Sequence, residues 1–273
     1  MAMDIQAYFD RIGFNGVARP DLATLTALHR AHALSISYEN MDVQLGRPLT
    51  TDPAAAFDKI VRRRRGGWCY EMNGLFGAVL DEIGFKVTRL AGGVMRAVRG
   101  DEAIGNHLVL LVDLDGEPWI ADVGFGDGPR EPYPLRPGPF TCDGYDFSLE
   151  RLDADGWRLH NQPSGGAPNF DFTTTPADPV LLAAKCQELQ TSPESIFVLT
   201  AIAQRHMPDE IRMLRGRAFR RITLTSGADS LIDTADDFVT LLKREFELDL
   251  PDAAEIWPRI VARHDELFAP QPA

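Results

Sequence analysis

Apolar residues recur at helical spacing throughout residues 1–84. The first such face ends at a glycine of the kind that stops helices, and it consists of Ile5, Tyr8, Phe9, Ile12 and Gly13. Asp21 and the pair Asp52-Pro53 have side chains that cap helix starts, and spaced apolar residues follow each of them. The pattern therefore predicts a helical bundle in the first third of the chain.

One predicted helix of this bundle follows two adjacent glycines, Gly66-Gly67, which allow a tight turn into it. Its apolar face has the 3.6-residue period and consists of Met72, Leu75, Phe76, Val79 and Ile83, with Gly84 at the expected stop. Cys69 falls in the first turn, where unpaired N–H groups and the helix dipole stabilise a thiolate. A lone cysteine is more often a small buried apolar residue, so this position alone does not establish a nucleophile.

In residues 85–190 the pattern changes to the alternation of strands. The glycine pair Gly92-Gly93 interrupts the first alternating segment, and two strongly apolar runs follow at residues 107–114 and 119–123. A second alternating pair flanks Asp155-Gly156. These segments predict a small antiparallel sheet or barrel.

Asp115-Gly116, between the two apolar runs, is the strongest short hairpin signal in the chain. A two-residue turn at this dipeptide places Val109 opposite Asp122. His107 and Asp122 are then diagonal neighbours on one face, about 7–8 Å apart at the backbone. The expected contact depends on this register, because a slip of one residue moves the two side chains to opposite faces.

The last third contains segments with helical spacing and segments with strand alternation. A helix is expected in residues 176–190, and a cap at residues 192–195 precedes a short helix or turn. Two strands are expected in residues 211–225, then a helix capped by Thr234 and a final helix in about residues 252–267. A helical bundle, a set of strands and an α/β segment together indicate an α+β architecture.

The chain has 273 residues, enough for one large domain or two to three small ones. Its formal net charge of −12 argues against non-specific nucleic-acid binding, which requires a basic surface. The densest positive cluster is the run of four arginines at residues 62–65. It is the place where an anionic ligand would be met, and its side chains would also stabilise a Cys69 thiolate if they fold back. A solvated helix end is the alternative role for this run.

No apolar run approaches the length of a membrane-spanning helix, and the first residues lack a signal-peptide pattern. Three widely separated cysteines do not suggest a disulfide framework, and Cys142 and Cys186 are expected to be structural. We therefore expect a cytoplasmic enzyme without a membrane segment.

A cysteine nucleophile requires a base within hydrogen-bond reach and a third group that orients the base. Of the six histidines, only His107 begins an apolar strand with a carboxylate, Asp122, expected on the same face. Cys69, His107 and Asp122 are therefore a candidate triad. A solvent-exposed Asp122 and a His107 bonded only to backbone are the alternatives. His29 and His32 have no partners at metal-ligand spacing and are expected to pack or to lie at the surface.

Several motifs resemble those of the arylamine N-acetyltransferases, in the same order along the chain. They are Tyr38-Glu39-Asn40, Arg65-Gly66-Gly67-Trp68-Cys69-Tyr70-Glu71-Met72-Asn73, Asn106-His107-Leu108, Asp122-Val123-Gly124-Phe125-Gly126 and Ser192-Pro193-Glu194-Ser195-Ile196-Phe197. The resemblance implies a cysteine-protease-like α+β fold in three parts. These are a helical bundle (1–84) that carries the nucleophile, an antiparallel β-barrel (85–190) that carries the histidine and aspartate, and an α/β lid (191–273).

The resemblance also implies acetyl-CoA-dependent N-acetylation of arylamines and arylhydrazines, by a ping-pong mechanism with acetyl-Cys69 as the intermediate. The expected acceptors are arylamines, hydrazines and arylhydroxylamines, and acetyl-CoA is the acetyl donor. Neither a metal nor a nucleic-acid partner is expected. A monomer or a homodimer is consistent with the resemblance.

The family's substrate-binding positions match Tyr38, Val94, Phe125, Gly126 and Phe197, so we expect these residues to bind the acceptor or CoA. Core packing is the alternative role for Val94, Phe125 and Phe197. The glycine-rich residues 124–128 would let the backbone approach the pantetheine or the phosphates of CoA. The segment lacks the lysine and the helix start of a P-loop.

Two other functions fit the same three side chains. A thiol hydrolase or transglutaminase uses a Cys-His-Asp triad on amide substrates, and it requires an open cleft. A structural zinc site can also use Cys69, His107 and Asp122 as ligands, although such a site usually has four ligands and no fourth candidate lies nearby in the sequence.

Overall fold

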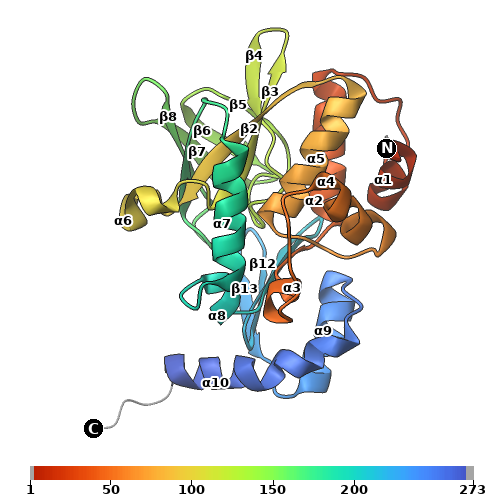
Figure 1. Cartoon of the computed structure of the whole chain (residues 1–273), viewed down its shortest axis with the longest axis vertical. Coiled ribbons are helices and arrows are strands. Elements are labelled where there is room, and N and C mark those ends of the chain that lie inside the picture. Colours follow the sequence, from red (N-terminus) through yellow and green to blue (C-terminus); the bar gives the residue numbers. More distant parts are fainter. Residues whose placement is uncertain (1–2, 269–273) are drawn as a thin grey trace.

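The computed structural model describes residues 3–268 of the chain, and they form an α+β fold. Figure 1 shows the helices of the first third, in red to orange, beside a curved antiparallel sheet. Of the last third, α7, in green-blue, stands beside the sheet, and the elements that follow it, down to α9 and α10 in blue, lie below. None of the described helices has the length and apolar composition that crossing a membrane requires.

The first third is helical, as predicted. Its elements are α1 (Ile5–Ile12), α2 (Leu22–Ser35), β1 (Tyr38–Glu39), α3 (Met41–Gln44), α4 (Pro53–Phe57), a π-helical turn (Asp58–Arg62) and α5 (Cys69–Ile83). The predicted caps form: Asp21 accepts a hydrogen bond from Thr24 N, and Asp52 accepts one from Ala54 N. Gly13 and Gly84 end their helices in the left-handed conformation, with φ of 72° and 104°.

The middle third contains an eight-stranded antiparallel sheet with the order β5-β4-β3-β2-β9-β8-β7-β6. The elements are β2 (Lys86–Val94), α6 (Arg96–Arg99), a 3₁₀ turn (Gly100–Ala103), β3 (His107–Leu114), β4 (Glu117–Ile120), β5 (Tyr133–Pro134), β6 (Gly138–Cys142), β7 (Tyr145–Arg151), β8 (Gly156–His160) and β9 (Asn169–Thr173). Within the described residues no ladder joins the end strands β5 and β6. The sheet is therefore an open half-barrel. The predicted antiparallel strands are present, but they do not close into a barrel.

The predicted interruption at Gly92-Gly93 is wrong, because β2 runs straight through both glycines. Gly92 is the last residue of β2 that pairs with β3, and Gly93 is the first that pairs with β9. A Cβ atom on Gly92 would lie 3.0 Å from Val109 Cγ2 and 3.1 Å from the His107 carbonyl oxygen. The glycine therefore allows a close approach to β3 where β2 changes partners.

The predicted hairpin forms at Asp115-Gly116, whose φ angles of 53° and 88° are both left-handed, as a type I′ turn requires. The predicted pairing of Val109 with Asp122 does not form, because the β3–β4 ladder ends at Leu111 and Ile120. Val109 pairs with Leu90 of β2 instead. Past the end of β4 the backbone bonds to side chains, with Val123 N donating to Asn73 and Gly124 N to Asp122.

The last third contains α7 (Pro179–Thr191), α8 (Ile196–Leu199), β10 (Ile202–His206), β11 (Ile211–Arg215), β12 (Ala218–Ile222), β13 (Gly227–Leu231), α9 (Ala235–Phe246), a 3₁₀ turn (Pro251–Ile256) and α10 (Trp257–Phe268). The predicted cap at Thr234 and the capped turn that Ser195 opens are both present. The sequence did not predict β10 or β13, or the pairing of β10 with the two-residue strand β1. This pairing joins the first third to the last.

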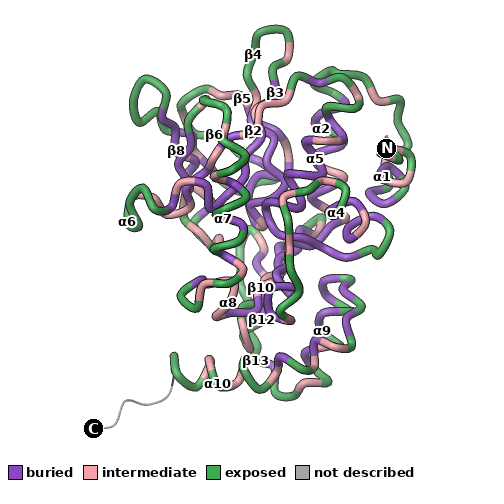
Figure 2. The backbone as a smooth tube through the Cα atoms, in the orientation of Figure 1, coloured by how far each residue is buried: buried purple, intermediate pink, exposed green. Residues whose placement is uncertain are grey.

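Buried residues concentrate where the three parts meet (Figure 2). One core cluster fills the helical first third, a second lies between the five-stranded sheet β1-β10-β11-β12-β13 and the helices α9 and α10, and a third fills the half-barrel. Tyr38, Leu214 and Phe125 belong to these three clusters in that order, and all three line one cavity. The candidate site is therefore built from every part of the chain.

Candidate active site

Cys69 is the first residue of α5, as the sequence predicted. The two preceding glycines lie against β1: Glu39 N donates to Gly67 O, and Gly67 N donates to Ser37 O. A Cβ atom on Gly66 would lie 2.2 Å from Ser37 O, so only glycine fits there. The glycine pair therefore holds the start of α5 against β1, in addition to allowing the turn.

Asp122 is fixed to α5 by Asn73, a residue that the sequence did not identify as part of the site. The Asn73 amide donates to Asp122 Oδ1 at 2.7 Å and to the Leu108 carbonyl oxygen at 2.6 Å. Its carbonyl oxygen accepts from Val123 N at 2.9 Å. Because Asn73 lies four residues after Cys69, both side chains project from the same face of the helix. One helix therefore carries the thiol and holds the carboxylate.

His107 and Asp122 form the predicted pair, with 2.6 Å between His107 Nε2 and Asp122 Oδ2. Both residues are only 2% exposed. Burial disfavours the imidazolium, but the charge of Asp122 and the hydrogen bond to it outweigh burial and raise the pKa of His107 to about 10. Burial opposes ionisation of Asp122 as well, yet the facing imidazolium and the donors Asn73 and Gly124 N keep its pKa below the usual value.

Cys69 is a second partner of the same imidazole. A hydrogen bond with its side chain, and the charge of its thiolate form, add to the interactions that raise the pKa of His107. Since Nε2 is bonded to Asp122, Nδ1 is the ring nitrogen left to face the sulfur. Cys69 Sγ also lies 4.0 Å from the Asn106 carbonyl oxygen. The structure thus brings the three predicted residues together; the β3–β4 ladder has the predicted register, with Leu114 opposite Glu117, but stops before Val109 and Asp122.

A cavity of about 370 Å³ opens onto the thiol and the imidazole. Four of the five predicted binding residues line it: Tyr38, Val94, Phe125 and Phe197. Gly126 itself does not, although Gly124 and Asp127 on either side do. Gly126 has a φ of +79°, and a Cβ atom there would lie 1.8 Å from Gln204 Oε1, so its role is to admit the Gln204 side chain.

The sequence and the fold both match known proteins. The N-acetyltransferase family model matches residues 21–256, and an arylamine N-acetyltransferase from Mycolicibacterium smegmatis is 40% identical over 266 residues, which cover 93% of this chain and 95% of that protein. The chain belongs to the arylamine N-acetyltransferase family. The enzyme of that name from Escherichia coli K12 is 45% identical over 218 residues, 74% of this chain and 73% of its own.

Solved structures of the family agree with the fold. The M. smegmatis arylamine N-acetyltransferase superposes with a TM-score of 0.86 at 36% identity, covering 96% of this chain and 98% of that one. The Mycobacterium marinum arylamine N-acetyltransferase, solved in complex with CoA, superposes with a TM-score of 0.85 at 32% identity. This match covers 96% of this chain and 99% of that one.

Phe125 and Phe197 bring aromatic rings into the wall of the cavity, and Phe170 and Trp68 pack behind them. The ring centroids of Phe125 and Phe170 lie 4.8 Å apart, and each ring also packs against His107, at 5.4 and 5.0 Å. Phe197, which also lines the cavity, meets Trp68 edge to face at 5.3 Å. The sequence did not identify Phe170, because it is one of several alternating apolar residues whose register with β2 was unknown. These rings favour a flat apolar acceptor.

One carboxyl group in the cavity wall, Asp127, has no role in the predicted triad. It is 1% exposed, and it accepts hydrogen bonds from Asn161 and from Gly166 N. Burial without a neighbouring cation raises its pKa to about 6. The signal in the sequence was an acidic residue within the glycine-rich residues 124–128, which we interpreted only as backbone that could approach CoA.

The run of arginines does not reach the site. Arg65 is buried against Glu39 at 2.8 Å and Asp42 at 3.1 Å, while Arg62 and Arg63 pair with Asp58. None of the four arginines lines the catalytic cavity; its cationic lining residues besides His107 are Arg99 and Arg215. The expectation that this run stabilises the thiolate directly is therefore wrong.

The other histidines of the first helices pack in the core, one of the two roles expected for them. His29 Nδ1 lies 2.9 Å from the Arg130 carbonyl oxygen, and His32 Nδ1 lies 2.8 Å from the Tyr8 hydroxyl. Cys142 and Cys186 are free and buried. In residues 3–268, no group of three or more His, Cys, Asp and Glu side chains is arranged to hold a metal ion.

Proposed function

We propose that this chain transfers acetyl groups from acetyl-CoA to arylamines and arylhydrazines, by a ping-pong mechanism through acetyl-Cys69. The observation that carries the proposal is the buried His107–Asp122 pair beside a cysteine at a helix start, facing a cavity lined by aromatic rings. Membership of the arylamine N-acetyltransferase family and the CoA complex of the M. marinum relative support the choice of substrates.

In the first half-reaction the resting enzyme holds a Cys69 thiolate and a His107 imidazolium. The raised pKa of His107, about 10, keeps its ring protonated at neutral pH. The thiolate attacks the thioester carbonyl, the bond to the CoA sulfur breaks, and the imidazolium gives that sulfur its proton. Acetylation removes the negative charge of Cys69, which lowers the pKa of His107 at the moment when it must act as an acid.

In the second half-reaction the amine nitrogen attacks the acetyl carbon of acetyl-Cys69. The bond to the Cys69 sulfur breaks, and neutral His107 takes the proton that the amine loses, which regenerates the ion pair. Asp122 keeps the proton on Nε2 and so leaves Nδ1 facing the sulfur. An arylamine is a weak base and enters an apolar cavity with its lone pair free.

The oxyanion of both tetrahedral intermediates requires a donor. We assign this role to the Cys69 backbone N–H, since the first N–H groups of a helix have no partner within the helix and lie at the positive end of its dipole. The aromatic wall contributes by excluding water, which would otherwise hydrolyse the thioester.

The same proposal includes the three-part, cysteine-protease-like organisation, with parts at residues 1–84, 85–190 and 191–273. The three core clusters support this division broadly, although β1 from the first part belongs to the sheet of the last. Residues of α8, β10 and β11 line the cavity, which supports a lid formed by the last part. A cytoplasmic location, a monomeric or homodimeric state and arylhydroxylamine acceptors stay predictions.

Intact-mass measurement after addition of acetyl-CoA, without an acceptor, tests the proposal. We expect a gain of one acetyl group that is lost when an arylamine is added and is absent in the Cys69→Ala variant. A peptide amide substrate serves as the control for a thiol hydrolase. Turnover of the peptide without acetylation of the enzyme would refute the proposal in favour of hydrolysis.

A further inference from the structure

A cavity of about 480 Å³ lies between the first and the last third of the chain, away from Cys69. It is lined by Arg11, Arg63, Arg64, Arg65, Lys243, Glu247 and Asp249. These residues come from α1, from the segment after the π-helical turn, from α9 and from the segment that follows α9. Figure 1 shows α9, in blue, below the helices of the first third. The cavity shares no lining residue with the catalytic one, and its size is within the range of small-molecule sites.

This cavity is positively charged in a strongly acidic protein. Five of its seven lining residues are cationic and two are acidic, whereas the chain as a whole has a formal net charge of −12. Cations are favoured in the last turns of α1 and α9, because the C-terminal end of a helix carries about half a negative charge. Two helix ends supply about one negative charge and do not balance the excess of cations.

Arg11 is a buried cation of this cavity. Only 9% of the residue is exposed, and its guanidinium donates to the carbonyl oxygens of Ile60 at 3.0 Å, Ser35 at 2.9 Å and Arg65 at 3.4 Å. Among residues 3–268 its partners are all carbonyl oxygens, and none is a carboxylate. Burial, followed by the like charge of Arg64, lowers the pKa of Arg11 to about 10. Since buried charges are normally paired, this guanidinium indicates that an anion belongs in the cavity.

The two acids of the cavity already have partners. Glu247 pairs with Arg205 at 2.6 Å, and Asp249 pairs with Lys243 at 3.0 Å. Glu247 also raises the pKa of Arg11, but this effect is smaller than that of burial. The carboxylates of the protein therefore compensate the charge of Arg11 only in part.

Arg64 is the exposed cation of this cavity most available to a ligand. Its φ is 53°, in the left-handed region where a residue other than glycine is strained. In the part of the chain that the structure describes, its side chain has no hydrogen-bond or ion-pair partner. By contrast, the neighbouring Arg63 pairs with Asp58 at 3.0 Å. Strained residues of this kind cluster at ligand clamps and switch regions.

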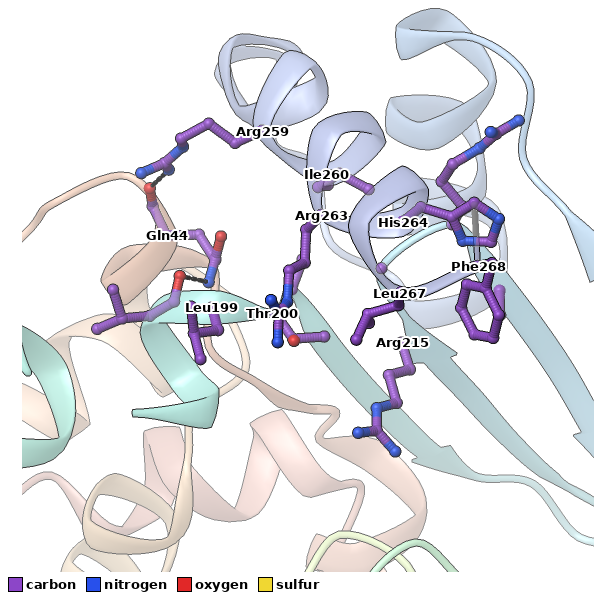
Figure 3. A pocket seen from close by; sticks show the side chains of 15 residues that line it. Gln44, Leu199, Thr200, Arg215, Arg259, Ile260, Arg263, His264, Leu267 and Phe268 are labelled. Carbon is purple, nitrogen blue, oxygen red and sulfur yellow. Dashed lines mark hydrogen bonds between the residues drawn. The ribbon is translucent and has the colours of Figure 1, made fainter. Parts of the chain in front are cut away.

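Another cavity that contains arginines, of about 350 Å³, lies under α10 (Figure 3). Two of its arginines are already bonded, Arg259 to the Gln44 carbonyl oxygen and Arg263 to Glu266 at 2.9 Å. Figure 3 shows apolar side chains of α10, among them Leu267, beside them. None of its four arginines is buried. A buried cation without a carboxylate partner therefore distinguishes the cavity at Arg11.

We propose that the cavity at Arg11 binds a phosphate group, as the free ion or as part of a phosphate monoester. Among the described residues that line it, Arg11 and Arg64 are the two cations without an ion-pair partner, and a phosphate group carries a balancing charge of about −1.5 to −2. Three of the five N–H donors of Arg11 are bonded to carbonyl oxygens, which leaves two for phosphate oxygens.

The bound group joins two parts of the chain. Arg11 and Arg64 belong to the first third, and Lys243 belongs to the last turn of α9. A phosphate between them therefore holds α9 against the helices of the first third. The site takes up part of the arginine run at residues 62–65, which the catalytic cavity does not use. It is independent of the proposed function, because no residue of the catalytic cavity takes part.

Calorimetric titration with inorganic phosphate, in a buffer without phosphate or sulfate, tests the site. We expect one phosphate per wild-type chain, and binding at least tenfold weaker in Arg64→Ala, because a charge-assisted hydrogen bond is lost. Arg64→Lys should bind with intermediate affinity, since lysine keeps the charge but not the planar fork of donors. Arg62→Ala, at an exposed arginine that does not line the cavity, is the matched control and should bind as the wild type does.

Arg263→Ala is a second control, because phosphate bound under α10 would produce a similar heat. If it abolishes binding and Arg64→Ala does not, the location is wrong. Equal binding by the wild type, Arg64→Ala and Arg64→Glu would mean an adventitious ion only and would refute the site. Glucose 6-phosphate separates the two sources of the group. Tighter binding than that of inorganic phosphate identifies a monoester, and weaker binding identifies the free ion.

Stability and activity give independent readouts. At a phosphate concentration 100 times Kd, the Tm of the wild type should rise by about 5–10 °C, and that of Arg64→Glu should rise far less. The KM for acetyl-CoA should be the same in Arg64→Ala and in the wild type. A raised KM in this variant would overturn the proposal of a separate site. If Cys69 is not acetylated but phosphate binds as described, the proposed function fails and the phosphate site stands.

Discussion

Two groups of buried charges lie on opposite faces of the first turn of α5. On one face Lys59 contacts Glu71 at 2.8 Å and Asp42 at 3.1 Å, and Arg65 contacts Glu39 and Asp42. On the other face His107 contacts Asp122. Cys69 and Glu71 are two residues apart, which turns their side chains to different sides of the helix.

The two groups differ in whether a polar atom remains without a charged partner and faces the cavity. In the ionic network each cation has at least two carboxylate partners, and none of its members lines the catalytic cavity. In the His107–Asp122 pair the carboxylate is saturated by Asn73, Gly124 N and His107, but one imidazole nitrogen is left to the thiol in the cavity wall. The buried charges of the Lys59 and Arg65 network therefore stabilise the structure. The buried His107–Asp122 pair instead leaves one ring nitrogen of His107 free to exchange a proton.

The largest effect is expected from Asp122→Asn. The amide keeps the shape and the bond from Asn73 but removes the charge that orients and protonates His107, so kcat/KM should fall by about 10⁴-fold. The free energy of unfolding should change far less than the activity does. Steady-state kinetics and urea denaturation measure the two quantities. Activity within tenfold of the wild type would mean that Asp122 has only a structural role.

Lys59→Met removes the central cation of the ionic network beside α5. It leaves Glu71 buried without a cation and Glu39 with Arg65 alone, so we expect the free energy of unfolding to fall by about 3–5 kcal/mol. The turnover number per folded molecule, counted by alkylation of Cys69, should stay close to that of the wild type. Lys243→Met, at an exposed lysine paired with Asp249, is the matched control and should have little effect. A large loss of turnover with unchanged stability would show that the network has a direct part in the chemistry.

Asn73→Ala tests how the His107–Asp122 pair is positioned, because Asn73 links α5 to Asp122. Without the amide, Asp122 loses one donor and its fixed position relative to Cys69, so we expect kcat to fall about a hundredfold. The KM for acetyl-CoA should change little, since Asn73 does not line the cavity. A change in KM alone would contradict a positioning role.

The smallest effect concerns Asp127, a buried carboxyl group that belongs to neither group. Its pKa of about 6 exceeds that of an unfolded aspartate, so the unfolded chain releases this proton first and the folded state is penalised as the pH rises from about 4 to 6. Asp127→Asn should remove the penalty and raise the free energy of unfolding at pH 8 by about 2 kcal/mol. At pH 4 the variant and the wild type should be equally stable. A variant that is less stable than the wild type at pH 8 would show that the ionised carboxylate is favoured.

Local signals predicted much of the fold. The caps at Asp21, Asp52 and Thr234 and the turn at Asp115-Gly116 depend on neighbouring residues, and the structure has all four. The contact between His107 and Asp122 was also predicted, from a register that is correct at Leu114 and Glu117 but that does not extend as far as expected. The ladder ends before Asp122, and Asn73 from another element brings the carboxylate into place.

The features that the sequence did not predict depend on distant partners. The strand β1 has two residues and exists because β10 pairs with it, so no period could indicate it. The buried position of Arg65 could not be predicted either, because its partners Glu39 and Asp42 are distant in the sequence. The position of Phe170 against His107 follows from the pairing of β9 with β2 and β8, which alternation alone does not fix, and Asp127 is held by the distant residues Asn161 and Gly166.

The two-residue strand β1 has a consequence for how the protein matures. Tyr38 and Gln204, which face each other across β1 and β10, both line the cavity that contains Cys69. In a chain that emerges from the ribosome, Cys69 is exposed before β10 can dock, and until then its sulfur is open to oxidants. The docking of the last third onto β1 therefore also decides when Cys69 becomes buried.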